Sequence, residues 1–248
     1  MSLGDDLELA VRAVRRGGAA ALARFGTPLD VADKGSGADP VTLADREAEA
    51  AIVELLRAER PQDGVLGEEG AAADASGPSA RRWVVDGLDG TANFVAGIPH
   101  WCVALGLEQA GEAVAAAVLD PVRGELFAGA RGEGLVAPDA GRGARGRIVA
   151  TFLHPRLLPA ADAGALATRL LEAGMSVRIG GSGTLDLAWV AAGRLDAWVE
   201  RDTAPWDWIP GQALVEAAGG HCLVRDGWHV ATRTHELAAE LAEVVTRS

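Results

Sequence analysis

Two aspartates, three residues apart, follow a short apolar run of strand type in this 248-residue chain. The run covers residues 83–85, and Asp86 and Asp89 come after it together with two glycines and Thr91. Carboxylate oxygens are ligands for Mg²⁺, and the backbone N–H groups of such a turn bind the phosphate that the cation neutralises. Taken alone, the segment also fits a Gly-Asp turn between two strands.

Further acidic residues stand where a predicted strand ends or a predicted helix begins. Glu68 and Glu69 close another short apolar run, Asp207 lies near a helix start, and Asp39 and Asp45 flank a second one. Each has a structural alternative, because acidic residues cap helix N-termini and paired glutamates occur in solvated loops. Their recurrence predicts that these carboxylates converge on one pocket.

The charge balance agrees with a cation-dependent site. A formal net charge of −12 argues against non-specific nucleic-acid binding, which needs a basic surface. An acidic protein that binds a phosphate ester has to neutralise the phosphate locally, and divalent cations held by carboxylates do this. Lys34 is the single lysine among 23 basic residues. It is a candidate for a position that needs a compact ammonium, with chance retention as the alternative.

Hydrophobic periodicity predicts an α/β fold in two parts. A Pro-, Gly- and Arg-rich stretch at 138–146 indicates a boundary between an α+β subdomain, residues 1–140, and an α/β subdomain, residues 147–248. The predicted helices cover 5–24, with Asp5 or Asp6 as N-cap, and 43–60, 160–173, 184–192, 209–218 and 234–245. The predicted strands cover 65–67, 83–85, 101–107, 113–119, 126–130, 148–152, 176–179, 197–199 and 221–224, with a hairpin turn at 111–112.

The sequence carries no run of about 18–20 apolar residues that would span a membrane. The acidic N-terminus lacks the basic-then-apolar order of a signal peptide. We therefore expect a cytoplasmic protein in which Cys102 and Cys222 are buried, reduced thiols.

Together, these motifs resemble the inositol monophosphatase family of Mg²⁺-dependent, lithium-sensitive phosphatases. The resemblance rests on Gly-Glu-Glu at 67–69, on Asp-Gly-Leu-Asp-Gly-Thr-Ala-Asn-Phe at 86–94, and on Pro-Trp-Asp at 205–207. It extends over nearly the whole chain and implies a layered αβαβα phosphatase fold, two to three Mg²⁺ ions and a homodimer.

The resemblance also implies roles for particular residues. The implied metal ligands are the side chains of Glu68, Asp86, Asp89 and Asp207 and the backbone carbonyl of Leu88. The implied phosphate and water contacts come from the amides of Gly90 and Thr91, from the Thr91 hydroxyl with Asp45, and from Glu68. The implied contacts with the rest of the substrate come from Gly181, Ser182, Gly183 and Glu200. Lys34 and Asp39 match a mobile loop near the most weakly held metal.

The residue inventory agrees with hydrolysis by a metal-activated water. The sequence offers no convincing nucleophile–base pair, and its five histidines are scattered. We expect Mg²⁺-dependent hydrolysis of a small phosphate monoester, first an inositol monophosphate, with no nucleic acid or membrane as partner. Histidinol phosphate, a sugar phosphate or a nucleotide 3′-phosphate are alternative substrates. A non-catalytic regulatory binding protein is the alternative class.

One position departs from the family pattern in a way that bears on the metal. Gly87 stands where the family usually has proline. Glycine loosens the backbone that presents the Leu88 carbonyl, so weaker metal affinity is expected.

Overall fold

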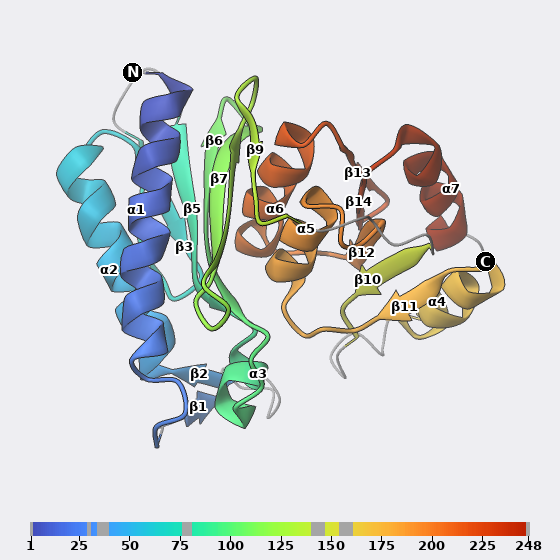
Figure 1. Ribbon diagram of the computed structural model, residues 1–248, viewed down its shortest axis with the longest axis horizontal. Coiled ribbons are helices and arrows are strands. Elements are labelled where there is room, and N and C mark those ends of the chain that lie inside the picture. Colours follow the sequence, from blue (N-terminus) through green and yellow to red (C-terminus); the bar gives the residue numbers. More distant parts are fainter. Residues whose placement is uncertain are drawn as a thin grey trace.

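The protein consists of five layers of helices and sheets. Its structure, a computed structural model, describes residues 2–28, 31–33, 40–75, 81–139, 147–153 and 161–246. Figure 1 shows the order across the molecule: α1 and α2, a seven-stranded sheet, α5 and α6, a five-stranded sheet, then α4 and α7. This confirms the predicted α/β class and the layered αβαβα arrangement.

The described residues form seven helices and fourteen strands. The helices are α1 (Leu3–Leu22), α2 (Leu43–Glu59), α3 (Thr91–Ala96), α4 (Ala161–Glu172), α5 (Gly183–Ala191), α6 (Pro205–Ala217) and α7 (His235–Thr246). The strands up to residue 136 are β1 (Val31–Asp33), β2 (Pro40–Thr42), β3 (Gly64–Gly67), β4 (Ala72–Ala73), β5 (Arg81–Asp89), β6 (Cys102–Gln109), β7 (Glu112–Asp120), β8 (Glu125–Ala130) and β9 (Gly134–Val136). The later strands are β10 (Ile148–Thr151), β11 (Ser176–Arg178), β12 (Ala197–Arg201), β13 (His221–Arg225) and β14 (Trp228–Thr232).

The two large sheets each mix parallel and antiparallel pairs. The first has the order β4-β3-β5-β6-β7-β8-β9, and its parallel pair is β3 with β5. The second has the order β11-β10-β12-β14-β13, with β10 parallel to both of its neighbours. Each sheet takes its strands from one side of the predicted 138–146 boundary. The subdomains 1–140 and 147–248 stay a prediction, and residues 140–146 lie outside the described part.

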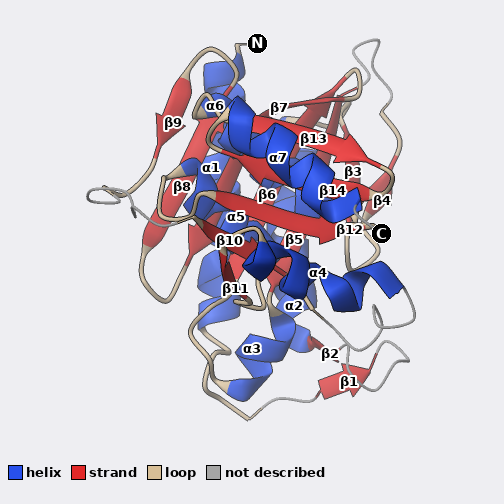
Figure 2. Ribbon diagram, turned by 90° about the vertical axis from the view of Figure 1, so that its right-hand side faces the viewer, coloured by secondary structure: helices blue, strands red, loops and turns tan. Residues whose placement is uncertain are grey.

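Alternation along the strands assigns side chains to the two faces of the first sheet. On β6, Val103, Leu105 and Leu107 pack toward α1 and α2, whereas Cys102 and Ala104 pack toward α5 and α6. Because helices cover both faces, both sets of side chains are apolar, and the strand reads as a continuous apolar run. A third cluster lies between the second sheet and α4 and α7, which lie in front of that sheet in Figure 2.

Helix α1 begins at a different cap from the one predicted. Ser2 is the N-cap, since its hydroxyl accepts the Asp5 N–H at 3.2 Å and the Asp5 carboxylate accepts the Ser2 N–H at 3.0 Å. This is a capping box, so Asp5 is its third helical residue. Asp6, the other predicted cap, is fully buried and forms ion pairs with Arg60 and Arg81.

Several short elements were not predicted. They are β1, β2, β4, β9, α3 and β14. All of them have six residues or fewer, so no helical or alternating period develops along them. The hairpin turn between β6 and β7 is also one residue earlier than predicted, because Ala110 (φ 53°) and Gly111 (φ 82°) adopt the left-handed conformation that a tight hairpin requires.

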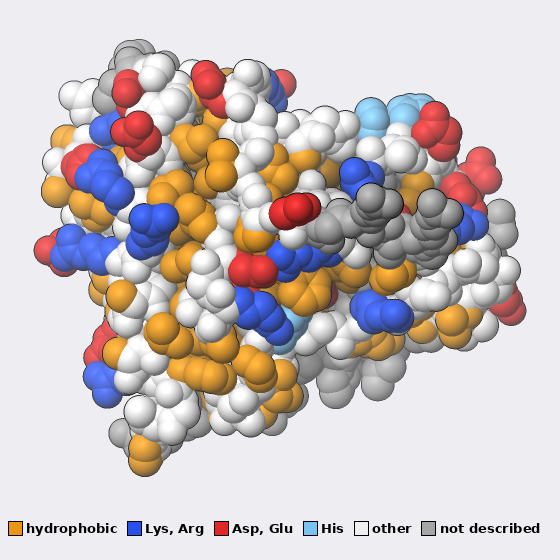
Figure 3. All heavy atoms as spheres, in the orientation of Figure 1, with side chains coloured by type: hydrophobic (Ala, Val, Ile, Leu, Met, Phe, Trp, Pro, Cys, Tyr) orange, Lys and Arg blue, Asp and Glu red, His pale blue; other side chains and the backbone are white. Residues whose placement is uncertain are grey.

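The cysteines, the apolar character of the helices and the surface charges can be compared with the expectations from the sequence. Cys102 and Cys222 are both free thiols as expected, but Cys102 is buried and Cys222 is only partly buried. Among the described helices, none combines the length and the apolar character needed to cross a bilayer. Basic and acidic side chains are intermixed on the face drawn in Figure 3. Arg194 forms an ion pair with Glu125 at 2.6 Å.

The contact between α5 and α6 gives a test of the fold. A Cβ atom at Gly211 would lie 2.4 Å from Cδ1 and 2.5 Å from Cβ of Leu187. We expect Gly211→Ala to lower the free energy of unfolding by about 1–3 kcal/mol, because overpacking outweighs the helix propensity that alanine gains. Thermal unfolding measures this, with Gly4→Ala as control, since only Ser2 Oγ lies within 4 Å there, at 3.6 Å. Equal stability of both variants would contradict this packing.

Candidate metal and phosphate site

The parallel pairing of β3 with β5 brings the first two acidic motifs together. Gly67 is paired with Val85, and the Glu68 N–H donates to the Val85 carbonyl oxygen at 3.3 Å. Parallel neighbours end at the same edge of a sheet, so Glu68 and Asp86 emerge side by side. The charge of Glu68 acts on Asp86 and raises its pKa.

The two aspartates of the central motif lie on an irregular stretch of β5, not beyond its end. The predicted strand end at Val85 is therefore wrong, since β5 continues to Asp89. Asp86 is paired with Ala104 and Asp89 with Cys102, so three steps on β5 match two on β6. Residues three apart on a regular strand face opposite sides, and a bulge re-aims one of them. The Asp86 carboxylate stabilises the bulge by accepting the Leu88 N–H at 2.8 Å.

Three carboxylates converge on one point. Ligand oxygens of Asp86, Asp89 and Asp207 all lie within 4.8 Å of one another. Asp207 comes from the first turn of α6, in the layer between the two sheets. Three of the four acidic residues implied as metal ligands thus meet in one place, and the fourth, Glu68, is close enough for its charge to raise the pKa of Asp86.

The electrostatics of the cluster favour a bound cation. Asp86 is fully buried, and burial raises its pKa well above the ordinary carboxyl value, as do the charges of Glu68, Asp89 and Asp207. Its Oδ2 is buried without a hydrogen-bond partner among the described residues. A buried carboxylate oxygen without a partner costs free energy, and a cation relieves that cost. The donors are hard oxygens, so the group fits Mg²⁺ better than zinc.

Asp89 is positioned from the second half of the chain. Its Oδ2 accepts the Ser182 hydroxyl at 2.6 Å and the Thr184 N–H at 2.8 Å, at the start of α5. Burial raises the pKa of Asp89, and these two hydrogen bonds act against that rise. Ser182 was predicted to contact substrate, but it is buried and its hydroxyl is committed to Asp89.

Asp45 has both of the roles that the sequence left open, since it caps a helix and also binds the Thr91 hydroxyl. Its Oδ2 accepts the Thr42 N–H at 2.8 Å and the Thr42 hydroxyl at 2.6 Å, so it belongs to the capping box of α2. Its Oδ1 accepts the Thr91 hydroxyl at 2.8 Å. One buried carboxylate therefore caps a helix and orients the threonine beside the cluster.

Glycines allow the two halves to approach at this point. Gly90 has φ 93°, and a Cβ there would lie 3.1 Å from the His100 carbonyl oxygen and from Ser182 Cβ. Gly181 has φ 87° and lies against Asn93. A Cβ at Gly183 would lie 3.6 Å from Glu200 Oε2. The predicted substrate-contact residues thus lie close to the cluster, while their contacts with substrate remain predictions. Lys34 and Asp39 lie outside the described residues.

The close packing of α2 on β5 explains why position 87 is a glycine. A Cβ there would lie 2.6 Å from the Asp45 carbonyl oxygen and 2.7 Å from the Glu49 nitrogen. Its lack of a side chain lets α2 approach β5 closely, which places Asp45 next to Thr91. The weaker metal affinity expected from this glycine stays a prediction.

Two residues around the site were missed from the sequence. Asn93 donates to the His100 carbonyl oxygen at 2.7 Å and to the Gly180 carbonyl oxygen at 2.9 Å, which joins the two halves of the chain. Glu49 is buried, and its carboxylate accepts backbone N–H groups of the turn after Glu68. For Glu49, the spacing of four residues after Asp45 was the available signal, because it places both on one helix face.

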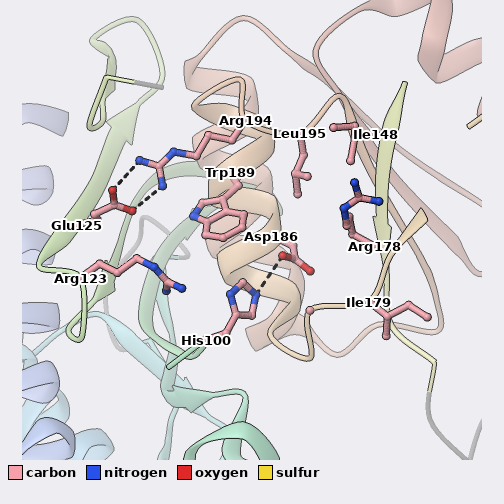
Figure 4. Close-up of a pocket in the computed structure, with 11 residues that line it drawn as sticks. His100, Arg123, Glu125, Ile148, Arg178, Ile179, Asp186, Trp189, Arg194 and Leu195 are labelled. Atoms are coloured by element: carbon pink, nitrogen blue, oxygen red, sulfur yellow. Dashed lines mark hydrogen bonds and ion pairs between the residues drawn. The ribbon is translucent and has the colours of Figure 1, made fainter. Parts of the chain in front are cut away.

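A cavity of about 650 Å³ borders this region on the side of α5. Figure 4 shows the His100–Asp186 pair beneath Trp189, with the Arg123 side chain pointing toward the cavity. His100 Nε2 lies 3.2 Å from Asp186 Oδ1. Among the described lining residues, none belongs to the carboxylate group of Asp86, Asp89 and Asp207, so this cavity is a neighbour of the metal site and does not contain it.

Comparison with known proteins finds relatives over nearly the whole chain. The model of the inositol monophosphatase family matches residues 4–246. An inositol-1-monophosphatase of Rhizobium meliloti is 35% identical over 97% of this chain and 96% of its own length. The Nus factor SuhB of Escherichia coli K12 is also 35% identical, over 96% of this chain and 92% of its own length. The solved structure of the extragenic suppressor protein SuhB from Bartonella henselae aligns with a TM-score of 0.88 and 31% identity, covering 98% of this chain and 99% of that one.

The raised pKa of Asp86 gives a test in the metal-free protein. A carboxyl whose pKa is higher in the folded than in the unfolded state contributes stability below its ordinary pKa of 3.8, and this contribution is lost as pH rises through the raised value. We expect Asp86→Asn, which keeps an acceptor for the Leu88 N–H, to raise the stability of metal-free protein at pH 8 by about 1–3 kcal/mol.

Denaturant unfolding in EDTA at pH 5 and pH 8 measures this effect, with Asp226→Asn as an exposed control. The gain of Asp86→Asn over the wild type is expected to be smaller at pH 5. A variant that is less stable than the wild type at pH 8 would contradict the electrostatic account.

Proposed function

This chain belongs to the inositol monophosphatase family and is a phosphoric monoester hydrolase, and from that premise we propose that it hydrolyses inositol monophosphate with Mg²⁺. The observation that carries the proposal is the convergence of Asp86, Asp89 and Asp207 within 4.8 Å, with a buried oxygen of Asp86 left without a partner. Such a group of oxygens is suited to a divalent cation beside a phosphate.

We assign the metal to the four acidic residues and one carbonyl. Glu68, Asp86, Asp89, Asp207 and the Leu88 carbonyl oxygen would hold two to three Mg²⁺ ions. When bound, Mg²⁺ lowers the pKa of water and neutralises charge on the phosphate and leaving oxygens. The acidic chain provides this neutralisation through the cation, since its own net charge of −12 would repel a phosphate.

The residues around the metal would orient the reactants. The Thr91 hydroxyl donates its proton to Asp45 Oδ1 at 2.8 Å, which leaves its lone pairs free to accept a hydrogen bond from water. A water held there through one hydrogen has a lone pair available for in-line attack on phosphorus, with Glu68 as a second contact. The amides of Gly90 and Thr91 would hold the phosphate oxygens. This arrangement lowers the barrier by orientation.

Two observations support the proposed substrate: the name of a similar protein, and the residues that lie next to the carboxylate cluster. A relative with 35% identity carries the name inositol-1-monophosphatase. Gly181, Gly183 and Glu200, with the Glu200 carboxylate as an acceptor for hydroxyl groups, would contact the ring. Histidinol phosphate, sugar phosphates and nucleotide 3′-phosphates use the same chemistry and remain alternatives. We also propose that the protein is a cytoplasmic homodimer without nucleic-acid or membrane partners.

A regulatory binding protein is the second candidate function. It is favoured by the name Nus factor, given to a relative that is 35% identical over 96% of this chain. The complete carboxylate group favours catalysis, because a protein without metal chemistry gains nothing from burying Asp86 without a partner for its Oδ2. The two functions are separable, since a variant that lacks activity can still be tested for partner binding.

Phosphate release from a panel of small phosphate esters, with Mg²⁺ or with EDTA, tests the proposal. We expect inositol monophosphate to give the highest kcat/KM, and EDTA to abolish turnover. Asp207→Asn should lower kcat/KM about 100-fold or more, equivalent to about 2.7 kcal/mol of barrier, because a cation ligand is lost. The control is Asp226→Asn, at an exposed position. Equal activity of Asp207→Asn and the wild type would refute the site.

Substitutions of Thr91 test the orientation of water separately. Thr91→Val removes the hydroxyl with little change in volume, and we expect kcat to fall about 100-fold. Thr91→Ser keeps the hydroxyl and should stay within about tenfold of the wild type. Steady-state kinetics at saturating Mg²⁺ measures both. If Thr91→Val kept the kcat of the wild type, the hydroxyl would have no role in positioning water.

A further inference from the structure

Glu49 is a buried acidic residue on the face of α2 that looks toward the metal cluster. It is 4% exposed and lies four residues after Asp45, so both carboxylates project from the same side of the helix. Its Oε2 accepts the Glu69 N–H at 2.8 Å, and its Oε1 accepts the Ala71 N–H at 3.0 Å. A single side chain thus binds two amides of the turn that follows β3.

That turn carries Glu68. It lies between β3 and β4, with the Gly67 N–H donating to the Ala71 carbonyl oxygen at 2.7 Å and the Glu68 N–H donating to Val85 at 3.3 Å. The next amides that the structure assigns, those of Glu69 and Ala71, donate to Glu49. Charged acceptors form the stronger hydrogen bonds to backbone amides, so Glu49 supplies a large share of the order in this turn.

Two glycines provide the space that Glu49 occupies between α2 and the sheet. A Cβ at Gly67 would lie 2.5 Å from Glu49 Oε2, so the glycine provides the space that the carboxylate occupies. A Cβ at Gly87 would lie 2.7 Å from the Glu49 nitrogen and 3.1 Å from its Cβ. The two glycines stand on the parallel neighbours β3 and β5, and they let α2 come close enough for Glu49 to reach the turn.

We propose that Glu49 is a positioning residue for the metal site: it fixes the turn at residues 67–71 so that the Glu68 carboxylate faces Asp86. The inference rests on the proposed function, since it needs a cation at Asp86, Asp89 and Asp207. Glu49 acts through the backbone and touches neither the cation nor the substrate. With Asp45, which holds Thr91, it makes α2 the element that sets both Glu68 and Thr91.

Calorimetric titration of the metal-free protein with Mg²⁺ is the primary test. Glu49→Gln keeps the shape but turns one acceptor oxygen into an NH₂ group, which cannot accept an amide N–H. We expect the Kd for Mg²⁺ to rise about 10-fold or more, the usual consequence of losing a group that orients a metal ligand. The Mg²⁺ concentration for half-maximal phosphate release should rise in parallel, while kcat at saturating Mg²⁺ changes less.

The control is Glu54→Gln, the same substitution on the same helix at an exposed side chain that pairs with Arg16. It should bind Mg²⁺ like the wild type. Gly67→Ala is a second route to the same effect, because it displaces the Glu49 carboxylate without changing that residue. It should weaken Mg²⁺ binding in the same direction, and thermal unfolding in EDTA reports whether each variant is folded.

The outcomes separate the inference from the function on which it rests. A wild type that binds no Mg²⁺ removes the proposed function. A wild type that binds Mg²⁺, with folded Glu49→Gln or Gly67→Ala binding equally well, overturns the role of Glu49 alone. If both variants lose their fold and added Mg²⁺ does not restore it, Glu49 is a structural residue only. That result also overturns the inference.

Discussion

A carboxylate with no solvent exposure, Asp86, lies among three other acidic side chains, and the arrangement of the site depends on how this charge is compensated. Burial and the neighbouring charges raise its pKa, so the chain by itself disfavours the ionised form. One oxygen accepts the Leu88 N–H, and the other has no partner among the described residues. Asp89 is treated differently, with Ser182 and Thr184 as donors. Protein donors thus bind one oxygen of Asp89, whereas one oxygen of Asp86 has no donor among the described residues and is suited to a cation.

The site cannot be assigned to either sheet. Asp86 and Asp89 belong to the first sheet, while Asp207 and the donors to Asp89 belong to α6 and α5 in the middle layer. The Asn93 amide donates to the carbonyl oxygens of both His100 and Gly180. The lack of a side chain at Gly90 lets the chain there approach Ser182 closely. These contacts cross between the halves of the chain and join them beside the three carboxylates.

Helix α2 shows how structural and chemical roles coincide in one element. Asp45 satisfies the N-terminus of the helix and holds the Thr91 hydroxyl, and Glu49 holds the turn after β3. Both depend on the short distance between α2 and the sheet, which Gly67 and Gly87 permit. Two acidic residues that resemble ordinary helix residues in the sequence therefore hold Thr91 and the turn after β3 next to the carboxylate cluster.

Local chemistry and the combined motifs allowed the sequence to predict the fold class, a long helix at 43–60, which is observed at Leu43–Glu59, and the three aspartates that meet at the site. Apolar periodicity and turn residues are properties of neighbouring positions, and a combined motif indicates candidate ligands by residue type and order. The sequence did not show that β5 runs on to Asp89 through a bulge, that Ser2 caps α1, or that Ser182 is committed to Asp89. It also gave no role to Glu49, whose partners lie about 20 residues away. Each of these depends on which segments pack together, so only the tertiary structure decided them.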